Sequence, residues 1–124
     1  MNKNPEIQFR SPEEIKAYQE SRLAEELLYL QNHSRFYQHL FQAYHIDIQQ
    51  IKTIEGLQQI PVTTKTDLQL HNEDFICVSR DEIIDYVTTS GTLGDPVTFV
   101  LTSEDLDRLA YNEYLSFTTT GCSR

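Results

Sequence analysis

Apolar residues recur at helical spacing through the first third of the chain. Ser11, Pro12 and Glu14 are typical of a helix start, because serine caps free N–H groups, proline tolerates the first position and Glu14 can complete a capping box. One broad apolar face follows, made by Ile15, Tyr18, Leu23, Leu27 and Leu30. The pattern predicts one amphipathic helix that ends near Gln31.

A second, shorter helix is predicted to begin at Ser34. Apolar and aromatic residues recur there at spacings of three and four, namely Phe36, Tyr37, Leu40, Phe41 and Tyr44. Such a stripe could line a pocket for an aromatic acid, but at helical spacing it is more typical of core. Asp47 and Thr53 then open short helical turns, and Thr64 with Asp67 forms a further capping box.

The pattern changes to short β-rich runs at residues 75–78, 83–87 and 97–101. The last two runs flank a loop with two glycines and a proline, which predicts a hairpin. Thr102 and Asp105 then cap a last helix with an inward face of Leu106, Leu109, Ala110, Tyr114 and Phe117. We therefore expect an α+β fold in which N-terminal helices lead into a small β-hairpin unit.

One partial domain fits the length of 124 residues. We divide it into a mainly helical segment at 1–72, strands and loop at 73–102, and a helix with a truncated end at 103–124.

The net charge of −9 disfavours nucleic acid and anionic membrane surfaces as partners. No apolar run approaches the ~20 residues of a membrane helix, and no secretory signal opens the chain, so we expect a cytoplasmic protein.

The segment with the most chemical content is 89–96, which reads TSGTLGDP. Its two glycines allow backbone N–H groups to turn toward an oxyanion, and the hydroxyls of Thr89, Ser90 and Thr92 can donate to the same oxygens. It lacks the lysine of a Walker loop and does not match GxGxxG. The alternative is an ordinary hairpin turn, in which small residues serve conformation alone.

This segment resembles the TSGTTGxP signature of the adenylate-forming enzymes, with seven of eight positions compatible. Residues 34–37 and 60–68 (SRFY and IPVTTKTDL) are similar to the stretch that opens phenylacetate-CoA ligases. The motifs stand in the correct order, and together they span residues 34–96. The resemblance implies the N-terminal part of the large N-terminal domain of such an enzyme, because family members are several times longer.

The resemblance also implies an activity. By this resemblance, a carboxylic acid, expected to be an aryl acid such as phenylacetate, is activated with ATP as an acyl-adenylate and then transferred to coenzyme A, with Mg²⁺ required. The phosphate-binding positions carried over are Thr89, Ser90, Gly91, Thr92 and Gly94. No catalytic residue and no metal ligand is assigned, and we expect the isolated chain to be inactive because adenine, ribose and acceptor contacts lie outside it.

Two departures from the signature favour an alternative reading. Leu93 replaces a hydroxyl-bearing residue, and Asp95 stands where a lysine is frequent. Eight carboxylates and one arginine, Arg108, lie between Asp81 and Glu113, which would repel a triphosphate. The alternative is a non-catalytic remnant or interaction module, and incomplete apolar faces would favour self-association to a homo-oligomer.

Several reactive residue types are assigned no function. The four histidines, His33, His39, His45 and His71, form no HxxxH or HxH pair, so metal binding is disfavoured. Lys65 is interpreted as a surface residue rather than a catalytic amine. The two cysteines belong to no CxxC pair and are expected to be free thiols.

Overall fold

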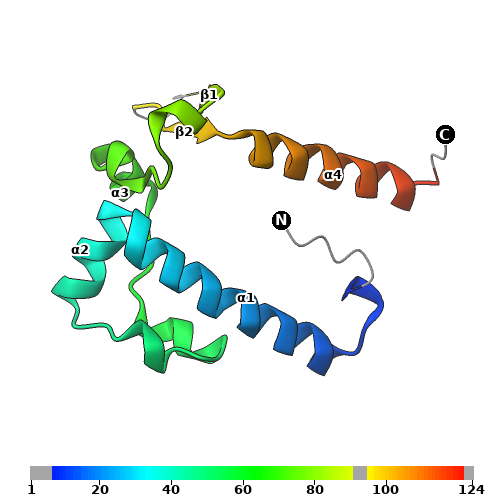
Figure 1. Ribbon diagram of the computed structural model, residues 1–124, viewed down its shortest axis with the longest axis horizontal. Coiled ribbons are helices and arrows are strands. Elements are labelled where there is room, and N and C mark those ends of the chain that lie inside the picture. Colours follow the sequence, from blue (N-terminus) through cyan, green and yellow to red (C-terminus); the bar gives the residue numbers. More distant parts are fainter. Residues whose placement is uncertain (1–6, 91–94, 122–124) are drawn as a thin grey trace. The chain divides into compact units, whose positions relative to one another are not determined.

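The computed structural model describes residues 7–90 and 95–121. Its helices are α1 (Pro12–His33), α2 (Arg35–Ala43), α3 (Lys65–Leu70) and α4 (Ser103–Thr119), and its strands are β1 (Asp85–Thr88) and β2 (Thr98–Leu101) (Figure 1). Short 3-10 helices lie between them: η1 (Ile7–Phe9), η2 (Ile48–Gln50), η3 (Glu55–Gln59), η4 (Asn72–Phe75) and η5 (Arg80–Glu82). The chain forms two compact units, Met1–Cys77 and Val78–Arg124.

The two N-terminal helices meet at one buried serine, Ser34. Its amide donates to the carbonyl of Leu30 at 3.0 Å and so ends α1. Its hydroxyl accepts from the amide of Tyr37 at 3.3 Å and donates to the carbonyl of Asp74 at 3.1 Å. The predicted cap is confirmed, and the same side chain also fastens η4 to the start of α2.

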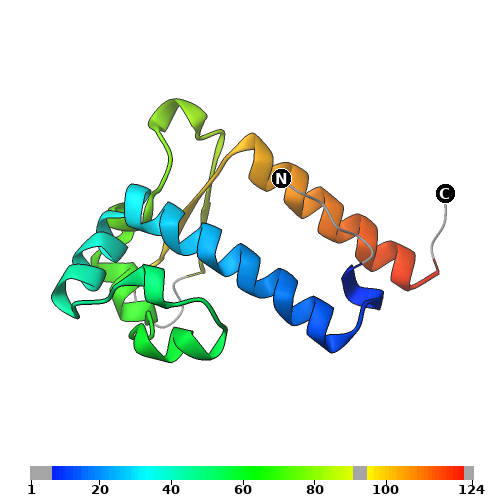
Figure 2. The same cartoon turned by 60° about the horizontal axis from the view of Figure 1, so that its bottom comes forward.

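The core of the first unit is small. Its buried members are Leu27, Phe41, Ile48 and Ile51, with six partly buried apolar side chains packed around them. Figure 2 shows the segment that carries η2 and η3 running beside α1. Lys16 Nζ donates to Glu55 Oε1 at 2.7 Å across this junction. Apolar burial and a few polar contacts therefore hold the loop segment on α1.

The aromatic stripe of α2 is largely core, as predicted. Phe41 is buried, and the ring of Phe36 stacks on that of Phe75 with centroids 4.0 Å apart. The ring of Tyr37 meets Phe75 edge-on at 6.0 Å, and its hydroxyl lies 3.0 Å from that of Thr63. Tyr44 departs from the pattern, because it is exposed.

The strand predicted at residues 75–78 is wrong. Residues 72–75 form η4, whose end is marked by the Ile76 amide donating to the Glu73 carbonyl at 3.2 Å. The Phe75 ring is used in stacking on α2, and the Cys77 carbonyl accepts from the hydroxyl of Tyr29 at 3.2 Å. The Ile76 amide and the Cys77 carbonyl, which a strand would need for its ladder, are therefore bonded to a local turn and to a tyrosine side chain instead.

The second unit contains the predicted hairpin. β1 and β2 pair antiparallel, with Val87 opposite Phe99 and Thr88 opposite Thr98. α4 follows β2 directly, and its capping box is confirmed, because the Thr102 hydroxyl accepts from the Asp105 amide while the Asp105 carboxylate accepts from the Thr102 amide. None of the helices in the described ranges combines the length and the apolar character needed to cross a membrane.

The predicted inward face of α4 is wrong for this chain. All five of its residues are exposed: Leu106, Leu109, Ala110, Tyr114 and Phe117. The two-stranded sheet of this unit offers too little apolar surface to cover the apolar face of a 17-residue helix. The periodicity therefore identified the helix and its apolar face but not what that face contacts.

Candidate phosphate-binding site

The candidate loop is closed at its base by two residues beyond the regular ladder. The Thr89 amide donates to the Val97 carbonyl at 3.0 Å, and the Val97 amide donates to the Thr89 hydroxyl oxygen at the same distance. Val97 is buried whereas Thr89 is exposed, so the pair is shielded from water on the valine side only. The two ends of the loop are thus held at a fixed spacing.

The geometry leaves Thr89 able to serve a ligand. Its hydroxyl oxygen accepts from the backbone, but a hydroxyl also carries one hydrogen that it can donate. Ser90 follows immediately and is exposed. Two of the predicted hydroxyl donors are thus consecutive residues at the start of the loop, and their role in phosphate binding stays a prediction.

The other predicted site residues lie outside the described residues. They are Gly91, Thr92 and Gly94, and the departing residue Leu93 is among the same four positions. Asp95 and Pro96, at the far end of the loop, are exposed. The assignment of the two glycines and of Thr92 to phosphate binding stays a prediction.

The charges of the second unit offer little help to an anion. Arg108 is the one basic residue of α4, and its guanidinium lies 3.4 Å from the carboxylate of Asp105. The backbone hydrogen bond from Thr102 lowers the pKa of Asp105 below its ordinary value, so that carboxylate stays charged. Polyphosphate binding here would depend on backbone amides and hydroxyls rather than on cations.

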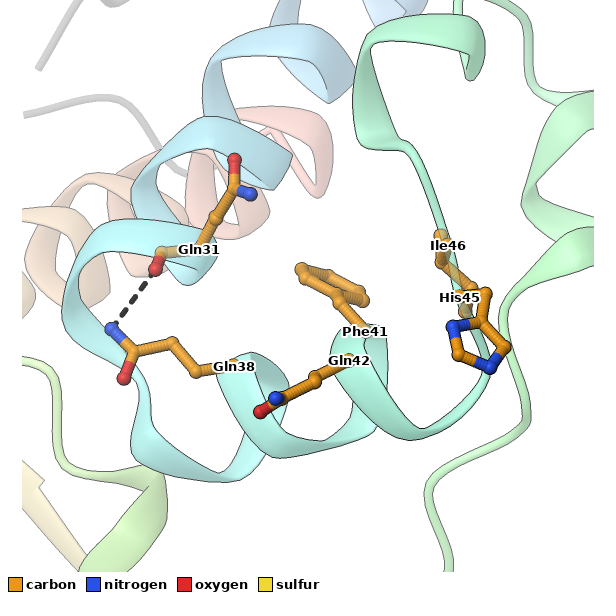
Figure 3. A pocket seen from close by; sticks show the side chains of 6 residues that line it. All are labelled: Gln31, Gln38, Phe41, Gln42, His45 and Ile46. Atoms are coloured by element: carbon orange, nitrogen blue, oxygen red, sulfur yellow. Dashed lines mark hydrogen bonds between the residues drawn. The ribbon is translucent and has the colours of Figure 1, made fainter.

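The first unit carries a pocket that sequence reasoning missed. It has a volume of about 470 Å³ and is lined by Gln31, Gln38, Phe41, Gln42, His45 and Ile46 (Figure 3). The side-chain amide of Gln38 donates to the Gln31 carbonyl at 2.9 Å, across the α1–α2 corner. Three glutamines and two apolar side chains make up the rest of the lining, so His45 is the one lining residue whose side chain can carry a charge or act as a nucleophile.

A second pocket of about 310 Å³ borders α2 and α3. Among its ten lining residues are Phe36, His39, Tyr44, Asp67 and His71. The described residues contain no group of three or more His, Cys, Asp or Glu side chains arranged to hold a metal ion. Asp67 is also committed to the capping box of α3, where its carboxylate accepts from the Thr64 amide at 2.7 Å.

Comparison with known proteins identifies relatives of the chain. No family model matches it. A phenylacetate-coenzyme A ligase from Thermus thermophilus is 33% identical over 103 residues, which is 82% of this chain and 23% of that protein. The resemblance found in the loop and the preceding motif therefore extends over most of the chain.

Solved structures agree with the sequence match. A 2-hydroxyisobutyryl-CoA ligase in complex with 2-HIB-AMP and CoA, in the thioesterification state, superposes with a TM-score of 0.79 and 27% identity over 87% of this chain. An open conformation of that ligase gives the same TM-score at 25% identity. The chain spans about a quarter of the length of these relatives, 24% and 26% respectively. The chain is thus similar in sequence to one part of a phenylacetate-CoA ligase and in fold to one part of an acyl-CoA ligase.

Proposed function

We propose that this chain, a phenylacetate-CoA ligase-like sequence, supplies the phosphate-binding part of an ATP-dependent acid–CoA ligase. In that reaction a carboxylate attacks the α-phosphorus of ATP and releases pyrophosphate, and the thiol of CoA then displaces AMP from the acyl-adenylate. The observation that supports it is the loop TSGTLGDP, held at its base by the Thr89–Val97 pair. The same ligands, an acyl-adenylate and CoA, occupy the solved relative.

Within this proposal the loop residues hold the β- and γ-phosphates of ATP. The amides around Gly91 and Gly94 approach the oxygens because glycine leaves no side chain in the way. The hydroxyls of Thr89, Ser90 and Thr92 donate to the same oxygens. Magnesium, bound to the triphosphate, would offset the carboxylates of this unit by adding positive charge next to them.

The acid is the least constrained part of the proposal. The curated relative is named for phenylacetate, and the solved relatives for 2-hydroxyisobutyrate. We propose an aryl acid, because sequence identity to the phenylacetate enzyme is the higher of the two, 33% against 27%. A cytoplasmic location stays a prediction of the same proposal.

We also propose that the 124 residues alone do not catalyse adenylation. Catalysis needs donors placed around the transferring group from several sides, and this chain supplies one loop. The alternative function, a non-catalytic interaction module, is favoured by Leu93 and Asp95, which depart from the signature. Weak binding of Mg–ATP would distinguish the ligase part from the interaction module, because a module without ligase chemistry does not need to bind the nucleotide.

The test is calorimetric titration of Mg–ATP into the chain, beside pyrophosphate release measured with ATP, magnesium and a panel of aryl, alkyl and 2-hydroxy acids. We expect binding weaker than about 100 μM, equivalent to about 5.5 kcal/mol, and no turnover. Gly91→Val should abolish the binding, whereas Thr66→Val, at an exposed position of α3, should not change it. Turnover by the isolated chain, or binding unaffected by Gly91→Val, would contradict the proposal.

A further inference from the structure

The pocket between α2 and α3 has an apolar part that contains two aromatic rings. The pocket has a volume of about 310 Å³, and all the residues that line it belong to the first unit. α2 contributes Phe36, Leu40 and Ala43, and Tyr44 follows at the end of that helix. Residues 61–62, which precede α3, add two further apolar side chains. The pocket can therefore hold an apolar or aromatic group.

Two carboxylates and two imidazoles make up the polar part of the same lining. They belong to His39 on α2, to Asp67 on α3, and to His71 and Asp74, which lie at the end of α3 and in η4. Among the described residues that line the pocket, none is a lysine or an arginine. The lasting charge of the lining is therefore negative.

Both carboxylates keep acceptor capacity for a ligand. The Thr64 hydroxyl and amide donate to Asp67 Oδ2, at 2.6 and 2.7 Å, and these bonds lower the pKa of Asp67, so its carboxylate is ionised at neutral pH. A carboxylate offers about four lone-pair sites, so two bonds to one oxygen leave sites for a further donor. His71 Nδ1 lies 3.7 Å from Asp74 Oδ2, which is longer than a hydrogen bond.

An aromatic ring lies next to these polar groups. The centroid of the Phe36 ring is 5.9 Å from that of the His71 ring, and His71 is the neighbour of Asp74. The stacking of Phe36 on Phe75, with centroids 4.0 Å apart, holds the ring in place. An apolar group and a charged group of one small ligand could thus be bound at the same time.

This lining disfavours two other classes of ligand. An aryl acid, the proposed substrate of the ligase, would bring a third carboxylate next to Asp67 and Asp74, and like charges repel. A metal ion is disfavoured because, in the described part of the chain, no three His, Cys, Asp or Glu side chains are arranged to hold one. The chemistry of the lining instead favours an organic cation.

We propose that this pocket binds an arylalkyl ammonium ion, which is a primary amine with one aromatic ring. The ammonium donates charge-assisted hydrogen bonds to Asp67 and Asp74. The ring packs among Phe36, Leu40 and Tyr44. Ligand pockets span about 300–1,000 Å³, and a pocket at the lower end of that range accommodates one ring and a short chain. The proposal does not depend on phosphate binding by the loop, which belongs to the second unit, so either can fail without the other.

The test is calorimetric titration of 2-phenylethylamine into the full chain at about pH 8, where an ordinary imidazole is neutral and an alkyl ammonium is charged. We expect a dissociation constant below about 1 mM. Phenylacetate, which carries a carboxylate on the same ring, should not bind. Butylamine, which reproduces a lysine side chain without a ring, should bind at least about threefold more weakly. Amide chemical shifts in the NMR spectrum should move at residues 36–44 and 67–74.

Matched substitutions test the carboxylate and the space. Asp74→Asn should weaken binding of 2-phenylethylamine at least about fivefold, because a hydrogen bond to a charged group is lost. Glu73→Gln removes the adjacent charge outside the pocket and should change the affinity less than about twofold. Ala43→Leu fills part of the pocket and should weaken binding, whereas Ala17→Leu on α1 should not. Circular dichroism checks that each variant is folded.

The same measurements can overturn the proposal. No binding of 2-phenylethylamine at about 10 mM, or binding of phenylacetate at the same residues, would contradict the ammonium site. Equal affinity for butylamine would assign the pocket to lysine side chains of a protein. Equal losses in Asp74→Asn and Glu73→Gln, or an unchanged affinity in Ala43→Leu, would place the ligand outside the pocket. None of these results bears on the titration of Mg–ATP.

Discussion

Thr89 and Val97 exchange two hydrogen bonds, one of which uses the threonine side chain in place of a backbone carbonyl. The Val97 amide donates to Thr89 Oγ1 at 3.0 Å, and the Thr89 amide donates to the Val97 carbonyl at 3.0 Å. Thr89, the first residue of the candidate loop, therefore closes the loop and is also proposed to contact phosphate. One hydroxyl can do both, because its oxygen accepts from the Val97 amide while its hydrogen remains available for donation.

Thr89→Val should destabilise the hairpin. The substitution keeps the side-chain shape but leaves the amide of buried Val97 without its acceptor, which costs about 1–3 kcal/mol. Amide hydrogen exchange at Val97 should accelerate accordingly. Thr89→Ser retains the hydroxyl and is the control; acceleration in both variants would contradict the role of the hydroxyl oxygen.

Ser34→Ala should destabilise the first unit. The change removes the acceptor for the Tyr37 amide and the donor to the Asp74 carbonyl, and cap losses of this kind cost about 1–2 kcal/mol. Urea unfolding followed by circular dichroism measures the effect. Ser21→Ala, which removes an exposed bond to the Tyr18 carbonyl, is the control and should cost less than about 0.5 kcal/mol.

Acid should weaken the start of α4 through Asp105. Hydrogen bonding by the Thr102 amide lowers its pKa below the ordinary value of 3.8, so the folded state holds the proton less tightly than the unfolded state. The stabilisation is complete above pH 3.8 and is lost as the pH falls through the lowered pKa. Helix content between pH 6 and pH 2 measures this loss.

Asp105→Asn should flatten that part of the acid response, because asparagine does not titrate. Asp67→Asn at α3 serves as a comparison, since the pKa of Asp67 is lowered for the same reason by hydrogen bonds from Thr64. Each variant should remove only its own share of the pH dependence. An unchanged acid profile in Asp105→Asn would show that the carboxylate is not the titrating group.

Leu93→Thr should strengthen Mg–ATP binding if the loop holds phosphate. The substitution restores the hydroxyl that the adenylate-forming signature carries at this position, and one added hydrogen bond contributes about 1 kcal/mol, or about fivefold in affinity. Calorimetry compares the variant with the parent chain. Leu28→Thr, at an exposed leucine of α1, is the control. Equal affinities in all three proteins would count against phosphate contact at residue 93.

Local chemistry made much of the fold predictable. The capping boxes at Ser11, Thr64 and Thr102 are confirmed, because each joins a side chain to an amide three residues away and needs no distant partner. The hairpin followed from two β-rich runs around a glycine-containing loop. The strand prediction at residues 75–78 was wrong because β-propensity reflects how well a side chain fits a half-buried sheet, whereas Phe75 packs on Phe36 of α2.

The sequence by itself determined where helices begin, which residues share a face and which segment resembles a phosphate loop, because these depend on neighbours along the chain. Tertiary structure alone decided that Ser34 fastens η4 to α2 and that the Thr89 hydroxyl closes the loop on Val97, since each contact joins residues that the chain brings together only by folding. It also decided that the apolar face of α4 meets solvent. Periodicity gives a face its composition, but only the packing partners available in space determine whether it is buried.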